Sequence, residues 1–418
     1  MKTLLKADGS GRALHLEDSY KKISIFYILL MGIYQMADKM YGSGFVAFMN
    51  AGGLTAVQIG FVLSFQDLAL AVFDYPSGNL ADRHGRKKTG SAGLLIWGIS
   101  LITFGLSSSF VHFLLSSLLM AIGLALFSGS HFSWYIDELI RLNKYEFRAK
   151  ILPWNRGIIM SFSVAGALLA SYLVRWNIQT PLIVAGILAI AGGIISFLVF
   201  QDNYGEGAET RFFRQLHFNT RQFARDKAMK IILAKNIFST FGFSIFILYW
   251  QLYAVNVLKL DYRVLGIVLI GMTLILTVSN FIVSYLTKFF DNYRITILGE
   301  VLVIAGFAVL SFQGSLLLFF TGIILLELGL GIDGASMNTW VQDHIGSQNR
   351  SSYNSALSSL GSLTGFVMLL VSGLIVDHVA PSFIWLMAGA GGAFSLGVLI
   401  LYAPFLRKHA DVLLEKQA

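Results

Sequence analysis

The sequence has no cysteine, and only 13% of its 418 residues are charged. Without cysteine the chain has no disulfide, no thiolate metal ligand and no cysteine nucleophile. The low charge argues against an ordinary water-soluble domain, in which about 25% of residues are charged. Proline, which interrupts helices, occurs only five times. Hydrophobic residues make up 56% of the chain, and the mean hydropathy is +0.68.

The hydrophobic residues form long runs, such as 23–48 and 231–255. Each run is long enough for the roughly 20 residues that cross a bilayer. A polar stretch at 202–229 divides the runs into two groups of six. We therefore predict an all-α membrane protein with twelve transmembrane helices in two six-helix halves, 23–201 and 230–404. The predicted spans are 23–47, 55–77, 90–108, 111–134, 153–174, 180–201, 230–255, 263–286, 294–312, 315–340, 352–376 and 381–404.

The positive charges predict the orientation of the chain. With both termini in the cytoplasm, about 25 lysines and arginines fall in cytoplasmic segments and about three outside, as the positive-inside rule requires. Residues 1–22 form a basic cytoplasmic segment without a cleavable signal, and 405–418 form a cytoplasmic tail. We predict a multi-pass protein of the cytoplasmic (inner) membrane and expect a monomer. The net charge of +8 comes from basic residues at the ends of the predicted helices and not from one basic face, so no nucleic-acid partner is expected.

The linker at 202–229 has an amphipathic pattern. Phe212, Leu216 and Phe223 fall on one side of a helical wheel, and three arginines fall on the opposite side. We predict a helix that lies along the anionic inner leaflet. The alternative is a mobile basic tether between the halves.

A basic turn follows the second predicted span. It resembles the signature G-x-L-A-D-R-x-G-R-K of the major facilitator superfamily, in the form common among bacterial efflux-type members, where an acidic residue, here Asp74, precedes Pro-Ser-Gly. The turn lies after the second of twelve spans, so the resemblance covers the whole chain. The matching residues are Gly78, Leu80, Ala81, Asp82, Arg83, Gly85, Arg86 and Lys87.

The resemblance implies a gating role for this turn. Asp82 is expected to contact the N-terminus of helix eleven, near Ser351 and Ser352, where the helix dipole favours a negative charge. The cations that follow are expected to pair with Asp137 or Glu138 at the end of helix four. Breaking and remaking these contacts then gates the cytoplasmic side. A turn that only orients the chain is the alternative.

Two marks of drug/proton antiporters are missing. Those proteins usually carry an arginine in helix four, four residues before a glycine, but Leu119 precedes Gly123 here. They also carry a Gly-Pro signature in helix five, and residues 161–170 contain no proline. Uptake of a nutrient therefore stays open beside export.

Ionisable residues deep in the membrane indicate the transport site. Asp38, Asp67 and Glu327 fall near the midplane of their spans, where a charge is costly unless it faces water or a partner. One of the three is the predicted proton-coupling site, and Lys39 adjoins Asp38. We predict that substrate contacts come from Tyr34 and Gln35. The alternative is a buried ion pair that only fastens two helices.

A second group of charged residues falls closer to the cytoplasm: Arg156, Lys235, Glu300 and Asp333. We interpret these residues as a possible inner gate or as structural pairs. At the other end of span seven, Tyr249, Trp250 and Tyr253 are expected to form an interfacial aromatic belt. A hydrophobic wall of the cavity is the alternative for them.

The sequence favours a transporter over other classes. It carries no H-E-x-x-H, G-x-S-x-G or phosphate-binding loop, so we predict no enzyme, no cofactor and no metal. Residues 329–334 match G-x-G-x-x-G but lie inside a predicted span. We predict a secondary transporter working by alternating access, with proton-coupled export of small drug-like or cationic compounds. Proton-linked uptake of a nutrient or organic anion is the alternative, and a channel or a non-transporting membrane protein comes after it.

Overall fold

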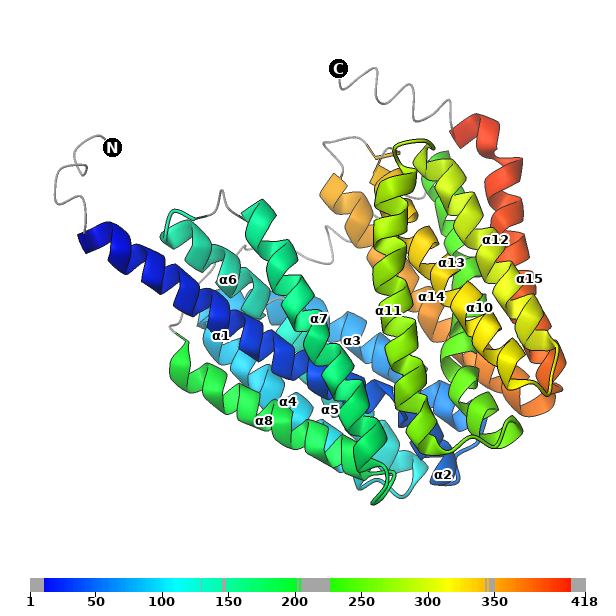
Figure 1. The fold of residues 1–418 in the computed structure, drawn as a ribbon, viewed down its shortest axis with the longest axis horizontal. Helices are drawn as coiled ribbons and strands as arrows, with labels where there is room; N and C mark the ends of the chain where they lie inside the picture. Colours follow the sequence, from blue (N-terminus) through cyan, green and yellow to red (C-terminus); the bar gives the residue numbers. More distant parts are fainter. Residues whose placement is uncertain are drawn as a thin grey trace. The chain divides into compact units, whose positions relative to one another are not determined.

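A computed structural model describes residues 11–128, 130–144, 148–200, 203, 226–342, 344–345 and 350–406. The described residues form helices joined by short turns, with no strand among them (Figure 1). The predicted amphipathic segment between Phe212 and Arg225 lies outside these residues. The predicted all-α architecture is confirmed.

The helices follow the predicted spans closely. The N-terminal half contains α1 (Gly11–Gly42), α2 (Phe45–Ala51), α3 (Ala56–His84), α4 (Arg86–Gly105), α5 (Phe110–Ser128), α6 (Ser130–Arg141), α7 (Arg148–Leu173) and α8 (Thr180–Val199). The C-terminal half contains α10 (Lys227–Leu252), the π-helix η2 (Tyr253–Val257), α11 (Tyr262–Leu286), α12 (Asn292–Ser311), α13 (Leu316–Gln342), α14 (Arg350–His378) and α15 (Pro381–Leu401).

Within the described residues, ten helical segments are long and apolar enough to cross a membrane. The two remaining predicted spans correspond to α1 and α4. The helix α1 starts at Gly11, well before the apolar run at 23, so it includes part of the predicted N-terminal cytoplasmic segment. The first predicted span, 23–47, was wrong in being continuous. It breaks at Ser43 and Gly44, between α1 and α2.

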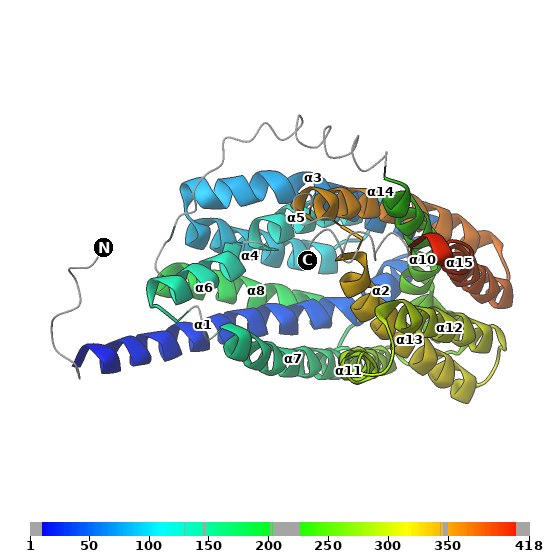
Figure 2. The same cartoon turned by 90° about the horizontal axis from the view of Figure 1, so that it is seen from above.

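The chain packs as two compact units. The first comprises residues 1–43, 72–107 and 118–208. In it α1 packs on α7 and α8, and α4 packs on α8. The second comprises residues 44–71, 108–117 and 209–418. In it α12 packs on α13 and α15, and α10 packs on α14 and α15 (Figure 2).

Glycines bring α12 and α13 of the second unit into backbone contact. A Cβ added at Gly306 would lie 2.7 Å from the backbone nitrogen of Leu326, and one at Gly329 would lie 2.6 Å from that of Val303. Small residues allow this close approach between membrane helices, whose association is driven by packing. The same contact determines where the charged residues of these helices meet.

Large apolar side chains cover the outside of the helices. Leu317 is 75% exposed, and Leu198 and Phe281 are exposed to a similar degree. Apolar surface on this scale is unfavourable in water but is the expected surface of a helix that faces lipid. The exposure pattern agrees with the multi-pass membrane assignment.

Candidate functional site

Three charged side chains from three helices meet in the interior of the second unit. Lys235 of α10 has its Nζ 2.9 Å from Oε1 of Glu300 on α12 and 2.8 Å from Oδ2 of Asp333 on α13. The side chains of Lys235 and Glu300 are each 1% exposed, and that of Asp333 is 15% exposed. Two carboxyl groups therefore face one lysine in a nearly dry environment. We call these three residues the charged triad.

Hydroxyl groups complete the surroundings of Glu300. Ser395 of α15 donates to Oε1 of Glu300 at 2.6 Å, and Ser239 of α10 donates to the same atom at 3.3 Å. The second oxygen, Oε2, is buried without a hydrogen-bond partner among the described residues. The sequence did not indicate either serine, because both are far from Glu300 along the chain and no local pattern links them to it.

The backbone contact between α12 and α13 positions the two acids. A Cβ added at Gly299 would lie 2.6 Å from the backbone nitrogen of Asp333, so the helices touch beside Glu300. The structure thus unites three of the four residues of the predicted inner gate. The fourth, Arg156, is an exposed residue of α7 in the other unit.

The predicted substrate site on α1 lies in the first unit. Lys39 Nζ is 3.0 Å from Asp38 Oδ2, and both side chains are about one-third exposed. The ring of Tyr34 packs against Trp97 and Phe127, with centroid distances of 5.0 and 4.6 Å. Its neighbour Gln35 accepts a hydrogen bond of 3.4 Å from Ser163 of α7.

Asp67 and Glu327, the other two midplane acids, lie in the second unit. Asp67 is exposed on α3, and among the described residues no lysine or arginine lies within ion-pair distance of it. A Cβ added at Gly365 of α14 would be 3.9 Å from Asp67 Oδ2, so this carboxyl faces α14. Glu327 is buried on α13, six residues before Asp333.

The basic turn of the motif lies between α3 and α4 in the first unit. Gly85 has a φ of +105°, a conformation that residues with a side chain rarely adopt. The Arg86 guanidinium then forms an ion pair with Asp137 of α6. Of the two acids that the resemblance left open, Asp137 is the one that Arg86 contacts. Glu138 instead pairs with Arg141, whose Nη2 lies 2.6 Å from its Oε2.

Other motif residues bind neighbouring helices. Asp74 Oδ1 accepts a hydrogen bond of 2.8 Å from Ser128 of α5. Lys87 Nζ lies 5.0 Å from the centroid of the Phe197 ring of α8, a cation–π contact. Of the other motif residues, Ala81 is buried and Leu80 is exposed. Three further motif residues and the two expected partners on α14 lie outside the residues whose burial is described: Gly78, Asp82, Arg83, Ser351 and Ser352.

One end of the second unit carries two helix caps that sequence reasoning missed. The Asp377 carboxylate, near the end of α14, accepts from the N–H groups of Ala56 and Val57 at 2.8 and 2.9 Å, at the start of α3. Gln251 of α10 accepts from the N–H groups that start α2, at 3.1 and 3.0 Å. Each side chain satisfies free donors of another helix's first turn. The pairs are more than 200 residues apart in sequence, so no local pattern indicates them.

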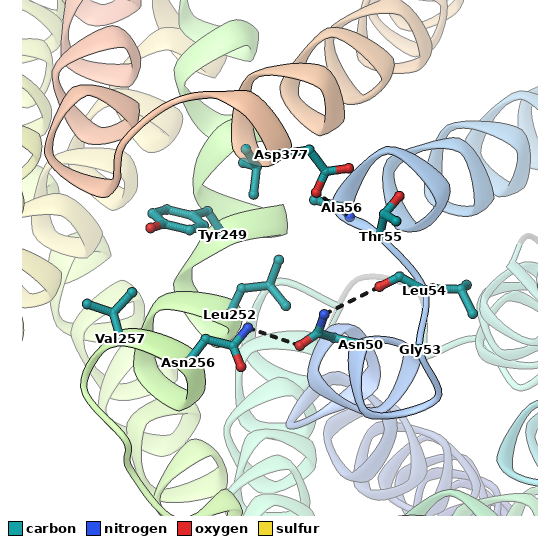
Figure 3. Close-up of a pocket in the computed structure, with 11 residues that line it drawn as sticks. Asn50, Gly53, Leu54, Thr55, Ala56, Tyr249, Leu252, Asn256, Val257 and Asp377 are labelled. Atoms are coloured by element: carbon teal, nitrogen blue, oxygen red, sulfur yellow. Dashed lines mark hydrogen bonds between the residues drawn. The ribbon is translucent and has the colours of Figure 1, made fainter.

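The Asp377 cap lines a cleft of about 390 Å³, and Figure 3 shows the residues around it. Asn256 of η2 donates to Asn50 of α2 at 3.0 Å across one side of it. Tyr249, which lines the cleft, also packs against Trp385 with centroids 5.0 Å apart. Tyr249, Trp250 and Tyr253 are all buried. The predicted interfacial belt was wrong, because these rings pack inside the helix bundle.

Removing the Asp377 cap is expected to loosen α3 from α14. Loss of a helix cap costs about 1 kcal/mol, or about a five-fold change in equilibrium. Ser64 is fully buried on α3, one turn after Gly60, which touches the α14 backbone. In this cysteine-free chain, Ser64→Cys is a single thiol reporter. We expect Asp377→Ala to raise its labelling by a water-soluble maleimide about five-fold.

Two variants control this experiment. Asp377→Asn keeps one acceptor oxygen and is expected to raise the labelling less. Asp291→Ala removes a comparable cap, from Arg294 of α12, and is expected to leave the labelling of Ser64→Cys unchanged. Equal labelling rates in the Asp377→Ala protein and the parent would show that the cap does not hold the two helices together.

Comparison with known proteins gives one matching family model and several relatives. The model described as Major Facilitator Superfamily matches residues 27–367. The uncharacterized MFS-type transporter YxaM of Bacillus subtilis (strain 168) is 20% identical over 235 residues, 55% of this chain and 58% of that protein. Multidrug resistance protein 2 of the same organism is 23% identical over 208 residues, 49% and 50% of the two chains. The chain thus matches about half the length of these relatives.

A crystal structure of a mutant of the nucleoside transporter NupG is similar over nearly the whole fold. The TM-score is 0.82 at 13% sequence identity, and the match covers 91% of this chain and 99% of that one. At this identity the likeness concerns the fold alone.

Proposed function

The chain belongs to the Major Facilitator Superfamily, and from that premise we propose that it is a proton-coupled exporter of small drug-like or cationic organic compounds. Members of this fold are secondary transporters built from two six-helix halves, with the substrate site near the membrane midplane. We propose a transporter and no enzymatic activity. We place both termini in the cytoplasm, on the grounds of the positive charges in the loops.

An excess of acids within the spans supports proton coupling. Asp67 has no cation within ion-pair distance among the described residues, and Glu327 is buried on α13. An acid inside a membrane is costly as a lone charge and is a functional candidate by default. Asp38 has Lys39 beside it, so its charge is partly balanced. Asp67 is therefore the best candidate for the proton-coupling residue.

The proposed direction of transport follows from the same charges. A carboxylate such as Asp67, with no lysine or arginine within ion-pair distance among the described residues, attracts cationic or amphiphilic compounds. Tyr34 of α1, in the other unit, is proposed separately as an aromatic substrate contact. The match to a multidrug resistance protein over half its length supports export. Lys39 is the side chain that favours the second candidate, uptake of an organic anion, but it already contacts Asp38.

The motif of the first unit is proposed as the cytoplasmic gate. Its turn is fixed by Gly85 and by the ion pair between Arg86 and Asp137. Ion pairs at helix ends can break and form again as helices move, because they are partly exposed to water. The motif residues Asp74, Gly78, Asp82, Arg83, Lys87 and Glu138 are assigned to the same gate.

Transport into liposomes that contain a pH-sensitive dye tests this function. We expect an amphiphilic cation to move against protons, and Asp67→Asn to abolish the proton movement by removing the group that binds the proton. Asp38→Asn and Glu327→Gln are measured alongside. Asp291→Asn is the matched control, since it exchanges an exposed acid and keeps a helix cap.

Each other outcome points to a different function. Protons that move in the same direction as a sugar or an organic anion would make the protein an uptake symporter. Substrate flux without any proton movement would refute the coupling. Flux that no gradient can drive uphill would make it a channel.

A further inference from the structure

We propose that the charged triad is a binding site for one exchangeable proton, which is carried by the carboxyl group of Asp333. The proposal rests on the proposed proton coupling for its role in transport. Proton binding itself is a property of the three side chains and is measured without any substrate. The site is separate along the chain from the midplane acids. Glu327 is the midplane acid that shares α13 with Asp333, and it lies six residues earlier, which is about 9 Å along the helix axis.

The charges of the triad do not balance when both acids are ionised. One lysine neutralises one carboxylate, so Glu300 and Asp333 together leave one negative charge. Burial of an uncompensated charge costs several kcal/mol. Among the described residues, the ion pairs of the triad involve these three charged side chains, while α15 contributes the hydroxyl of Ser395. One proton added to either acid makes the triad neutral.

The contacts of the two acids differ, and they indicate which one holds the proton. Oε1 of Glu300 faces three donors, from Lys235, Ser239 and Ser395. Such a set suits a permanent carboxylate. Among the described side chains, only Lys235 donates hydrogen bonds to the Asp333 carboxylate. When Asp333 takes up a proton, Lys235 keeps Glu300 as its partner and remains neutralised.

Exposure supplies the route for exchange. Asp333 is 15% exposed, whereas Lys235 and Glu300 are each 1% exposed. A proton can thus reach Asp333 from the surface of the unit without unpacking the helices. The geometry differs from that of a purely structural ion pair, in which a lysine and a single carboxylate would suffice.

Infrared difference spectroscopy of the purified full-length protein, between acidic and alkaline pH, tests the proposal. The probe is the proton alone. We expect a titrating C=O band of a buried carboxylic acid that disappears in Asp333→Asn. It is also expected to disappear in Glu300→Gln, because the remaining acid then pairs with Lys235 at all pH values. Asp291→Asn, which changes the exposed acid that caps α12, is expected to keep the band.

The spectra distinguish this proposal from the proposed function. If neither Asp333→Asn nor Glu300→Gln removes any titrating band, the proton site is overturned; a separate band from Asp67 is expected to remain in both variants. A band that responds to sodium chloride and not to choline chloride would make it a sodium site, which also overturns the assignment. If the band behaves as expected while the liposome assay shows no proton flux, the proton site stands and the coupled transport fails.

Discussion

Replacement of Lys235 by methionine is expected to destabilise the protein by about 3–5 kcal/mol, the cost of breaking a buried ion pair by removing one partner. The two carboxylates of Glu300 and Asp333 would then face each other without a cation in a nearly dry interior. Methionine fills a similar volume, so the loss measures the charge and not a cavity. The measurement is thermal unfolding in detergent, followed by tryptophan fluorescence.

Second-site variants separate charge from packing. Adding Glu300→Gln to Lys235→Met removes one of the two unpaired carboxylates, and we expect it to restore a large part of the lost stability. Lys230→Met is the matched control, because Lys230 is exposed on the same helix. If Lys235→Met melts at the same temperature as Lys230→Met, the triad contributes nothing to stability.

Substitution of Gly329 on α13 is expected to have the second large effect. Gly329→Ala places a Cβ 2.6 Å from the backbone nitrogen of Val303 and 2.7 Å from the carbonyl oxygen of Gly299. Both atoms belong to the α12 backbone, so the helices have to move apart. Overpacking of this kind costs about 1–3 kcal/mol. We expect a clear drop in the unfolding temperature.

The same helix supplies the control for this substitution. A Cβ at Gly334 meets no atom within 4 Å, so Gly334→Ala is expected to leave stability unchanged or slightly higher. Equal unfolding temperatures for Gly329→Ala and Gly334→Ala would mean that the close contact of α12 and α13 is not required. The contact lies beside Glu300, so Gly329→Ala is also expected to weaken the infrared band of the triad.

The match to G-x-G-x-x-G at 329–334 shows why a motif needs its context. Two of its glycines face neighbouring helices, Gly329 against α12 and Gly331 against Ser279 of α11. The third, Gly334, faces open space. Gly329 and Gly331 thus serve helix packing in a membrane bundle, which requires small residues just as a nucleotide loop does.

Some of the candidate site was predictable. Charged residues inside apolar runs stand out, so Lys235, Glu300 and Asp333 were identified from the sequence as a group, together with Arg156, which lies in the other unit. The motif also indicated that a cation of the α3–α4 turn meets an acid after span four, and Arg86 contacts Asp137. The partner of Asp377 was not predictable, since Ala56 lies 321 residues earlier and backbone N–H groups have no sequence signature.

The sequence alone determined the helical membrane architecture, because a bilayer requires long apolar helices with their backbone groups internally bonded, and that requirement is local. It also determined which residues carry charge inside the spans. Only the tertiary structure decided that Lys235 faces two acids, that Arg86 contacts Asp137, and that the Tyr249 cluster is buried. Contacts between helices depend on which faces meet, and the glycines that allow α12 and α13 to touch have that effect only in the folded bundle.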